Sequence, residues 1–168
     1  PKTSSAASDV YKRQLLKLLP PMTIADLGAG EGTFSQLLAQ RAEKVIAIDN
    51  SEKMIEYASG LARQNGVENV EFRLGDLENP PIDDNSVDLA FFSQALHHAN
   101  KPQRAVEAGF RILKPGGRIV ILDLLKHSFE DDREIYRDVW LGFSEVEIHE
   151  FLQTAQFREI ETTVVDQE

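Results

Sequence analysis

Short apolar runs alternate with amphipathic segments along most of the chain. Residues 22–27, 45–48 and 87–92 contain few polar side chains, which is typical of strands buried on both faces of a parallel sheet. Residues 118–124 form a fourth run of this kind. Between the runs, apolar side chains recur every three or four residues, and this spacing predicts helices.

Two more segments alternate apolar and polar side chains, the pattern of a strand with one solvent-exposed face. We place the first of them, residues 70–74, at the edge of the sheet. The second, residues 159–165, predicts a sixth strand. Strands that alternate with helices in this way predict an α/β fold with a doubly wound, mainly parallel sheet.

Two of the predicted helices have clear start signals. Ser51 is a suitable N-cap for a helix that runs to Asn65, because its hydroxyl can accept a hydrogen bond from a backbone N–H of the first turn. Ser144 and Glu147 have the spacing of a capping box. We therefore expect a helix over residues 145–155.

The most informative segment is the glycine turn, residues 26–32, with the sequence Asp-Leu-Gly-Ala-Gly-Glu-Gly. It joins a predicted strand to a predicted helix, and alternate glycines let the backbone turn sharply and lie against a bound molecule. Asp49 follows Gly28 by 21 residues and ends the next strand, where an acidic residue accepts hydrogen bonds from ribose hydroxyls. These features predict a nucleoside-cofactor site at the carboxyl ends of the strands.

Length and composition restrict the class of protein. The 168 residues correspond to one domain, and no apolar run reaches the roughly 20 residues of a membrane span. The absence of cysteine excludes disulfides and thiolate metal sites, and leaves a cytoplasmic location as the default expectation. The net charge of −10 argues against nucleic-acid binding and favours a cationic ligand.

The residues around the glycine turn indicate which cofactor it holds. A dinucleotide site reads Gly-x-Gly-x-x-Gly, whereas here the last glycine comes one position early and Thr33 takes its place. Four acidic residues would meet at the same crevice: Asp26, Glu31, Asp49 and Asp76. Such a set repels a pyrophosphate and suits an amine and a sulfonium.

Five motifs in order resemble the class I S-adenosylmethionine-dependent methyltransferases. They are the glycine turn, Asp49, Gly-Asp-Leu at 75–77, residues 83–89 and Leu-Lys-Pro-Gly-Gly at 113–117. Gln-Ala-Leu-His-His at 94–98 and Trp-Leu-Gly-Phe at 140–143 resemble most the methyltransferase domains fused behind arsenic-repressor-type winged-helix regulators, followed by quinone-type methyltransferases. The resemblance covers residues 22–165 and implies a Rossmann-like sheet of strand order 3-2-1-4-5.

The resemblance also implies S-adenosyl-L-methionine as the cofactor and assigns residues to it. Asp26, Gly28 and Gly30 would surround the methionine moiety, and Asp49 would accept hydrogen bonds from the ribose hydroxyls. Met54 would flank the adenine, although on its own it is more simply explained as core. The full implied set is Asp26, Gly28, Ala29, Gly30, Asp49, Asn50, Met54, Gly75, Asp76, Leu77 and Ser93.

Methyl transfer from a sulfonium is an in-line displacement, so the enzyme chiefly aligns the acceptor and needs no catalytic triad. His97 or His98 could act as general base where the acceptor loses a proton, and the alternative is a histidine that serves only the fold. A paired-His metal site lacks an evident third ligand, so no metal is expected. The acceptor is an unidentified small molecule, and residues 129–143 are the expected lid.

The two ends of the chain carry separate expectations. Residues 4–14 resemble the in-frame translation of a transposon-type sequencing-library adapter, so residues 1–14 are expected to be a non-native tail. Residues 15–168 would then be a single methyltransferase domain that is incomplete at both ends. Because the family's seventh, antiparallel strand is expected beyond residue 168, an open sheet edge and low stability are expected.

Two other functions remain open at this point. The chain could be a cofactor-binding sensor module that serves a winged-helix DNA-binding domain encoded upstream. A nucleotide-sugar or NAD enzyme is a further alternative. Arsenite methylation, which in its family relies on cysteine thiolates, is disfavoured because the sequence contains no cysteine.

Overall fold

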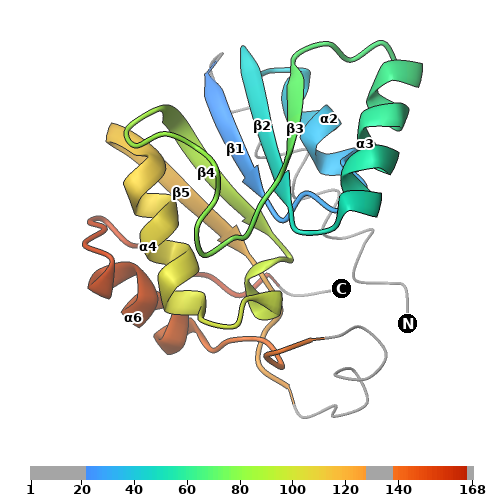
Figure 1. Ribbon diagram of the computed structural model, residues 1–168. Coiled ribbons are helices and arrows are strands. Elements are labelled where there is room, and N and C mark those ends of the chain that lie inside the picture. The colour runs from blue at the N-terminus through green and yellow to red at the C-terminus, as the bar shows by residue number, and fades with distance from the viewer. Residues whose placement is uncertain (1–21, 128–137, 166–168) are drawn as a thin grey trace.

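The computed structural model describes residues 22–127 and 138–165, and its centre is a five-stranded sheet (Figure 1). The spatial order is β3-β2-β1-β4-β5, and all four neighbouring pairs are parallel. The strands are β1 (Thr23–Leu27), β2 (Lys44–Asp49), β3 (Val70–Leu74), β4 (Val87–Ser93) and β5 (Leu113–Leu122). The doubly wound fold, its strand order and the edge position of residues 70–74 are confirmed.

Helices cover both faces of the sheet. In Figure 1, α2 and α3 lie on the right of the sheet, and α4 and α6 lie on the left. The described helices are α2 (Thr33–Ala39), α3 (Glu52–Gln64), the single 3-10 turn η1 (Leu96–His98), α4 (Pro102–Ile112) and α6 (Glu145–Thr154). None of the described helices is long and apolar enough to cross a membrane.

The core divides at the sheet because successive side chains of a strand point to opposite faces. Ala25 and Leu27 belong to a cluster with residues of α4 and α6, including Val106 and Leu152. Ile24, the residue before Ala25, points to the other face and packs with α2 in a second cluster. Two buried faces explain why β1, β2 and β4 read as continuous apolar runs.

The predicted helix caps are present. The Ser51 hydroxyl accepts a hydrogen bond from the Met54 N–H at 3.4 Å. At α6, the Ser144 hydroxyl accepts from the Glu147 N–H at 3.2 Å, while the Glu147 carboxylate accepts from the Ser144 N–H at 2.9 Å. The capping box that the sequence predicts is therefore complete.

The prediction of a sixth strand was wrong. Residues 159–165 form no strand. Glu159 has φ of 54°, outside the extended region, and Val164 and Val165 are 45% and 42% exposed. An alternating pattern becomes a strand only where a neighbour completes its backbone hydrogen bonds, and none of the described strands pairs with this segment.

The boundaries of the last strand also differ from the prediction. β5 begins at Leu113, which pairs with Val87, and it ends at Leu122. The Leu-Lys-Pro-Gly-Gly motif at residues 113–117 therefore lies inside this strand, as an irregularity where the register with β4 shifts and Gly116 adopts a φ of 79°. The expected tail over residues 1–14 and most of the expected lid lie outside the described residues.

Candidate functional site

The glycine turn leaves the carboxyl end of β1 and is held against the end of β2. The N–H groups of Gly28 and Ala29 both donate to the carbonyl oxygen of Ile48, at 2.9 and 2.8 Å. Gly28 has a φ of 86°, and a Cβ at this position would collide with Ala95 Cβ. The backbone can therefore approach the segment after β4 only because residue 28 has no side chain.

The second and third glycines of the turn have different surroundings. Gly30 has a φ of 53°, and no atom lies within 4 Å of where its Cβ would be, so this part of the turn faces open space. Gly32 has a φ of 73°, and a Cβ there would lie 2.8 Å from Ala58 and Phe72. Gly32 thus serves the packing of the turn, while Gly30 leaves backbone accessible to a ligand.

Asp49 at the end of β2 is tied to the turn. One carboxylate oxygen accepts from the Gly30 N–H at 2.9 Å, and the other accepts from the Ser51 N–H at 2.9 Å. A carboxylate has about four acceptor sites, so two more hydrogen bonds can be accepted. Asp49 is therefore oriented by the backbone and still able to bind a pair of hydroxyls.

One cavity of about 990 Å³ lies over the carboxyl ends of β1, β2 and β4. Ten of the eleven predicted cofactor-binding residues line it, which are Asp26, Gly28, Ala29, Gly30, Asp49, Asn50, Met54, Asp76, Leu77 and Ser93. The exception is Gly75, which does not line the cavity and whose missing Cβ would collide with Pro81. Glycine is needed at position 75 because Pro81 packs closely against its backbone.

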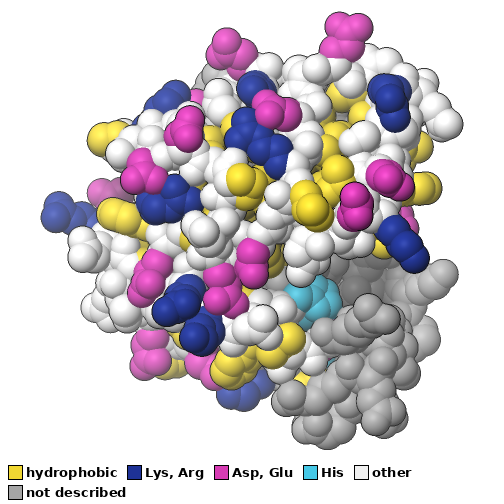
Figure 2. Space-filling view, in the orientation of Figure 1, with side chains coloured by type: hydrophobic (Ala, Val, Ile, Leu, Met, Phe, Trp, Pro, Cys, Tyr) yellow, Lys and Arg dark blue, Asp and Glu magenta, His cyan; other side chains and the backbone are white. Residues whose placement is uncertain are grey.

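The cavity wall is acidic. Asp26, Glu31, Asp49 and Asp76 all line it, as the sequence predicts, and the described lining residues include no Lys or Arg. On the face shown in Figure 2, acidic and basic side chains are interspersed. The negative charge of the cavity wall favours a cationic ligand.

Two side chains in the cavity lack the surroundings of ordinary core residues, one by its exposure and one by its hydrogen bonding. Met54 is 38% exposed, so it is not the plain core residue that was the alternative for it. Ser93 has a buried hydroxyl oxygen for which no described group is a hydrogen-bond partner. Since buried polar atoms are nearly always paired, this hydroxyl fits a position that a ligand completes.

The sequence did not predict that side chains of α2 and α3 form part of the cavity wall. Phe34 and Leu37 of α2 and Leu61 of α3 line the cavity, together with Asn65 just beyond α3. These side chains look like ordinary core-facing positions of amphipathic helices. Gln94, another lining residue, has a φ of 54°, a strained conformation that clusters at functional sites.

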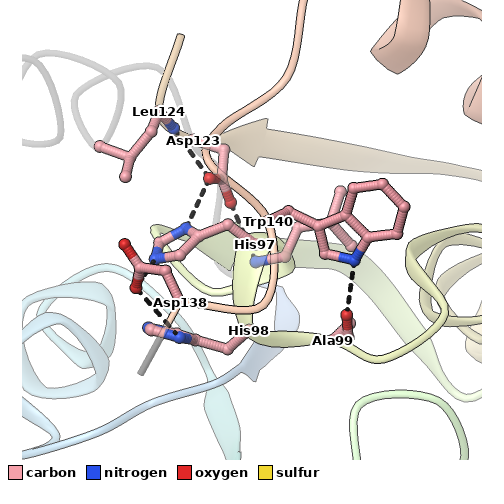
Figure 3. A network of polar contacts seen from close by, with 8 residues as sticks. His97, His98, Ala99, Asp123, Leu124, Asp138 and Trp140 are labelled. Carbon is pink, nitrogen blue, oxygen red and sulfur yellow. Dashed lines mark hydrogen bonds and ion pairs between the residues drawn. The ribbon is translucent and has the colours of Figure 1, made fainter. Parts of the chain in front are cut away.

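The two adjacent histidines have different surroundings. His98 lines the cavity, whereas His97 is buried and does not line it. His97 Nδ1 lies 2.7 Å from a carboxylate oxygen of Asp123, the residue after β5. Asp123 also accepts hydrogen bonds from the Leu96 and Leu124 N–H groups, at 2.9 and 2.8 Å (Figure 3).

Burial by itself would lower the pKa of His97. The hydrogen bond that the imidazole donates to Asp123 and the negative charges of Asp123 and Asp138 outweigh that effect, and they raise the pKa of the imidazole above its ordinary value of 6.5. Since an ionised carboxylate only accepts hydrogen bonds, Nδ1 is the donor to Asp123, and Nε2 points toward Asp138 (Figure 3).

Asp138 was not among the residues expected at the site. Its Oδ1 lies 3.4 Å from His97 Nε2 and 3.5 Å from His98 Nδ1. The following segment is fixed by Trp140, whose backbone N–H donates to the His97 carbonyl at 2.9 Å and whose indole N–H donates to the Ala99 carbonyl at 3.0 Å. The structure thus supplies a carboxylate as a third possible ligand beside the two histidines, which the sequence did not reveal.

Comparison with known proteins agrees with this geometry. A family described as "Methyltransferase domain" matches residues 19–162. Arsenite methyltransferase from Halobacterium salinarum is 35% identical over 129 residues, covering 74% of this chain and 33% of the relative. Demethylmenaquinone methyltransferase from Clavibacter sepedonicus is 42% identical over 100 residues, covering 60% of this chain and 40% of the relative.

Solved structures show the same fold. The crystal structure of a SAM-dependent methyltransferase from Aquifex aeolicus has a TM-score of 0.75 and 28% identity, over 88% of this chain and 79% of that one. YcgJ protein from Bacillus subtilis has a TM-score of 0.76 and 27% identity, over 88% of this chain and 68% of that one.

The matched family, the fold and the cavity together define the class of protein. The chain belongs to the class I S-adenosylmethionine-dependent methyltransferases, and the cofactor of this class is S-adenosylmethionine. The chain spans about a third to two fifths of the length of the first curated relatives it matches.

Proposed function

We propose that the chain binds S-adenosylmethionine in the cavity and transfers its methyl group to a small-molecule acceptor. One observation carries the proposal: ten of the eleven residues implied as cofactor contacts line a single acidic cavity at the carboxyl ends of the parallel strands. This edge of an open α/β sheet is where such folds bind their ligands.

The residues present fit the cofactor. The free acceptor sites of Asp49 suit the two ribose hydroxyls, and the open space at Gly30 lets the backbone lie against the methionine moiety. The unpartnered hydroxyl of Ser93 is available to a polar group of the ligand. We assign the adenine to Asn50, Met54, Asp76 and Leu77, which also line the cavity.

The bound cofactor supplies an electrophilic methyl group on a sulfonium, and the chain supplies alignment. Holding an acceptor in line can contribute on the order of 7–11 kcal/mol. Of the two histidines, His98 borders the cavity, so we assign to His98 the general base role where the acceptor loses a proton. A cytoplasmic location and a winged-helix domain encoded upstream are predictions that belong to this proposal.

The test is calorimetric titration with S-adenosylhomocysteine and, separately, with NAD. We expect saturable one-to-one binding of the former and none of the latter. Asp49→Asn should weaken binding about 10- to 100-fold, because hydrogen bonds to a charged group contribute about 1.5–3 kcal/mol.

The matched control is Glu56→Gln, which removes an exposed acid of α3 that does not line the cavity. It should bind like the wild type. Tight NAD binding, or an equal loss in both variants, would overturn the proposal.

A further inference from the structure

We propose that His97, His98 and Asp138 bind a divalent metal ion of the zinc class at the rim of the cofactor cavity. The proposal goes beyond methyl transfer, since it concerns a second binding site with its own ligand. It rests on four features: the spacing of the ligand atoms, the buried carboxylate, the support of His97 by Asp123, and the position of His98.

The ligand atoms have the spacing of a coordination sphere. Ligands about 2.0–2.1 Å from a tetrahedral zinc ion lie roughly 3.3–3.4 Å from one another. Asp138 Oδ1 lies 3.4 Å from His97 Nε2 and 3.5 Å from His98 Nδ1, and the ligand atoms of all three residues lie within 4.8 Å of one another. These separations are long for N–H···O hydrogen bonds but close to those of shared ligands.

Asp138 needs a cation at this point. Its side chain is 3% exposed, and no described group donates a hydrogen bond to Oδ1. A buried carboxylate is costly unless it is paired or coordinates a metal. An ion at the centre of the three ligand atoms would supply that charge directly.

Asp123 hydrogen-bonds His97 in the way that carboxylates orient metal-binding histidines. It holds the proton on Nδ1 at 2.7 Å, which directs the lone pair of Nε2 toward Asp138. Metal-binding histidines almost always donate their other N–H to such a partner. Asp123 is itself fixed by two backbone N–H groups, at 2.9 and 2.8 Å.

The ligand types indicate the ion. Two imidazoles and one carboxylate suit zinc and similar first-row ions rather than calcium or magnesium, which prefer oxygen. Three protein ligands leave a fourth position open, as in catalytic zinc sites. His98 places that open position beside the cavity, where a bound water or acceptor would occupy it and the ion would take over activation of the acceptor from His98.

A network without metal is the competing explanation. In that case a protonated His97 alone would offset the charges of Asp123 and Asp138. The two explanations differ in the role of Asp138. In the metal site its carboxylate binds the ion, whereas in the metal-free network it forms an ion pair with the protonated imidazole of His97. Direct metal titration separates them.

The experiment is titration of the metal-free chain with Co²⁺, followed by its visible absorption and by competition with Zn²⁺. We expect a saturable one-to-one spectrum that Zn²⁺ abolishes. His98→Ala and Asp138→Asn should each weaken Co²⁺ binding at least about tenfold. His98 is 45% exposed, and Asp138→Asn preserves shape, so both variants should keep the wild-type circular dichroism.

The matched control is His149→Ala, which removes an exposed histidine of α6. It should bind Co²⁺ like the wild type. No saturable Co²⁺ binding by the wild type, or binding that survives both site variants, would refute the metal site.

The outcome is independent of the cofactor. If S-adenosylhomocysteine binds and Co²⁺ does not, only the metal site fails. If Co²⁺ binds and S-adenosylhomocysteine does not, the proposed methyltransferase function fails and the metal site stands.

Discussion

At the scale of single residues, Gly28 and Gly30 offer a matched comparison. Both have positive φ, so an alanine at either position incurs the left-handed backbone cost of about 1–2 kcal/mol. Only at position 28 would the added Cβ also collide with a neighbour, Ala95, whereas position 30 has open space. The two substitutions therefore separate backbone strain from packing.

We expect Gly30→Ala to lower the free energy of unfolding by about 1 kcal/mol. Gly28→Ala should lower it by about 3 kcal/mol, because overpacking adds about 1–3 kcal/mol to the backbone cost. Urea unfolding of the two variants measures both values. Equal losses would show that the close approach of the glycine turn to Ala95 is not required.

The acidic residues of the site could be predicted from the sequence because the carboxyl ends of parallel strands meet at one edge of a sheet. Asp123 could have been found by the same rule, since it directly follows β5, the neighbour of β4. The same rule could not predict Asp138, because this residue directly follows none of the described strands. It lies in an irregular segment, two residues before Trp140, whose N–H groups donate hydrogen bonds to the His97 and Ala99 carbonyls.

At the scale of elements, the start of α6 depends on the charge of Glu147. The Ser144 N–H, the ammonium group of Lys126 and the Ser144 hydroxyl donate hydrogen bonds to this carboxylate, and they lower its pKa from 4.5 to about 2. Because the folded-state pKa is depressed, the stabilisation is present above about pH 4.5 and is lost as the pH falls toward 2.

We therefore expect Glu147→Gln to lower the free energy of unfolding at pH 7, by about 1 kcal/mol as for other helix caps. The gap between variant and wild type should shrink at pH 3. Glu145→Gln is the control, since it removes an acid of the same turn that takes no part in the capping box. A gap that does not change with pH would contradict the role of the ionised carboxylate.

The elements that the sequence predicted well are those with a local signal. The capping box at Ser144 and the N-cap at Ser51 depend on side chains close in the chain. Residues 159–165 have an equally clear alternating pattern but form no strand, because a strand depends on a partner elsewhere in the fold. Alternation alone shows which face a segment could bury and not whether it pairs.

At the scale of the whole molecule, the sheet collects residues from distant parts of the chain into one cavity. Asp26 lies near the end of β1, Asp49 ends β2 and Ser93 ends β4, and all three line the same cavity. β5 lies at the edge of the described sheet, and the residue after it, Asp123, supports the histidine pair. The cofactor cavity and the proposed metal site are thus neighbours because their strands are neighbours.

The measurement that tests this arrangement most directly is a titration of the ¹⁵N-labelled chain with S-adenosylhomocysteine, followed by amide chemical shifts. We predict saturable shifts at Gly28, Gly30, Asn50 and Leu77, which line the cavity, while the amides of α6 stay unchanged. Shifts confined to α6, or none at all at saturating ligand, would contradict the assignment of the cavity as the cofactor site.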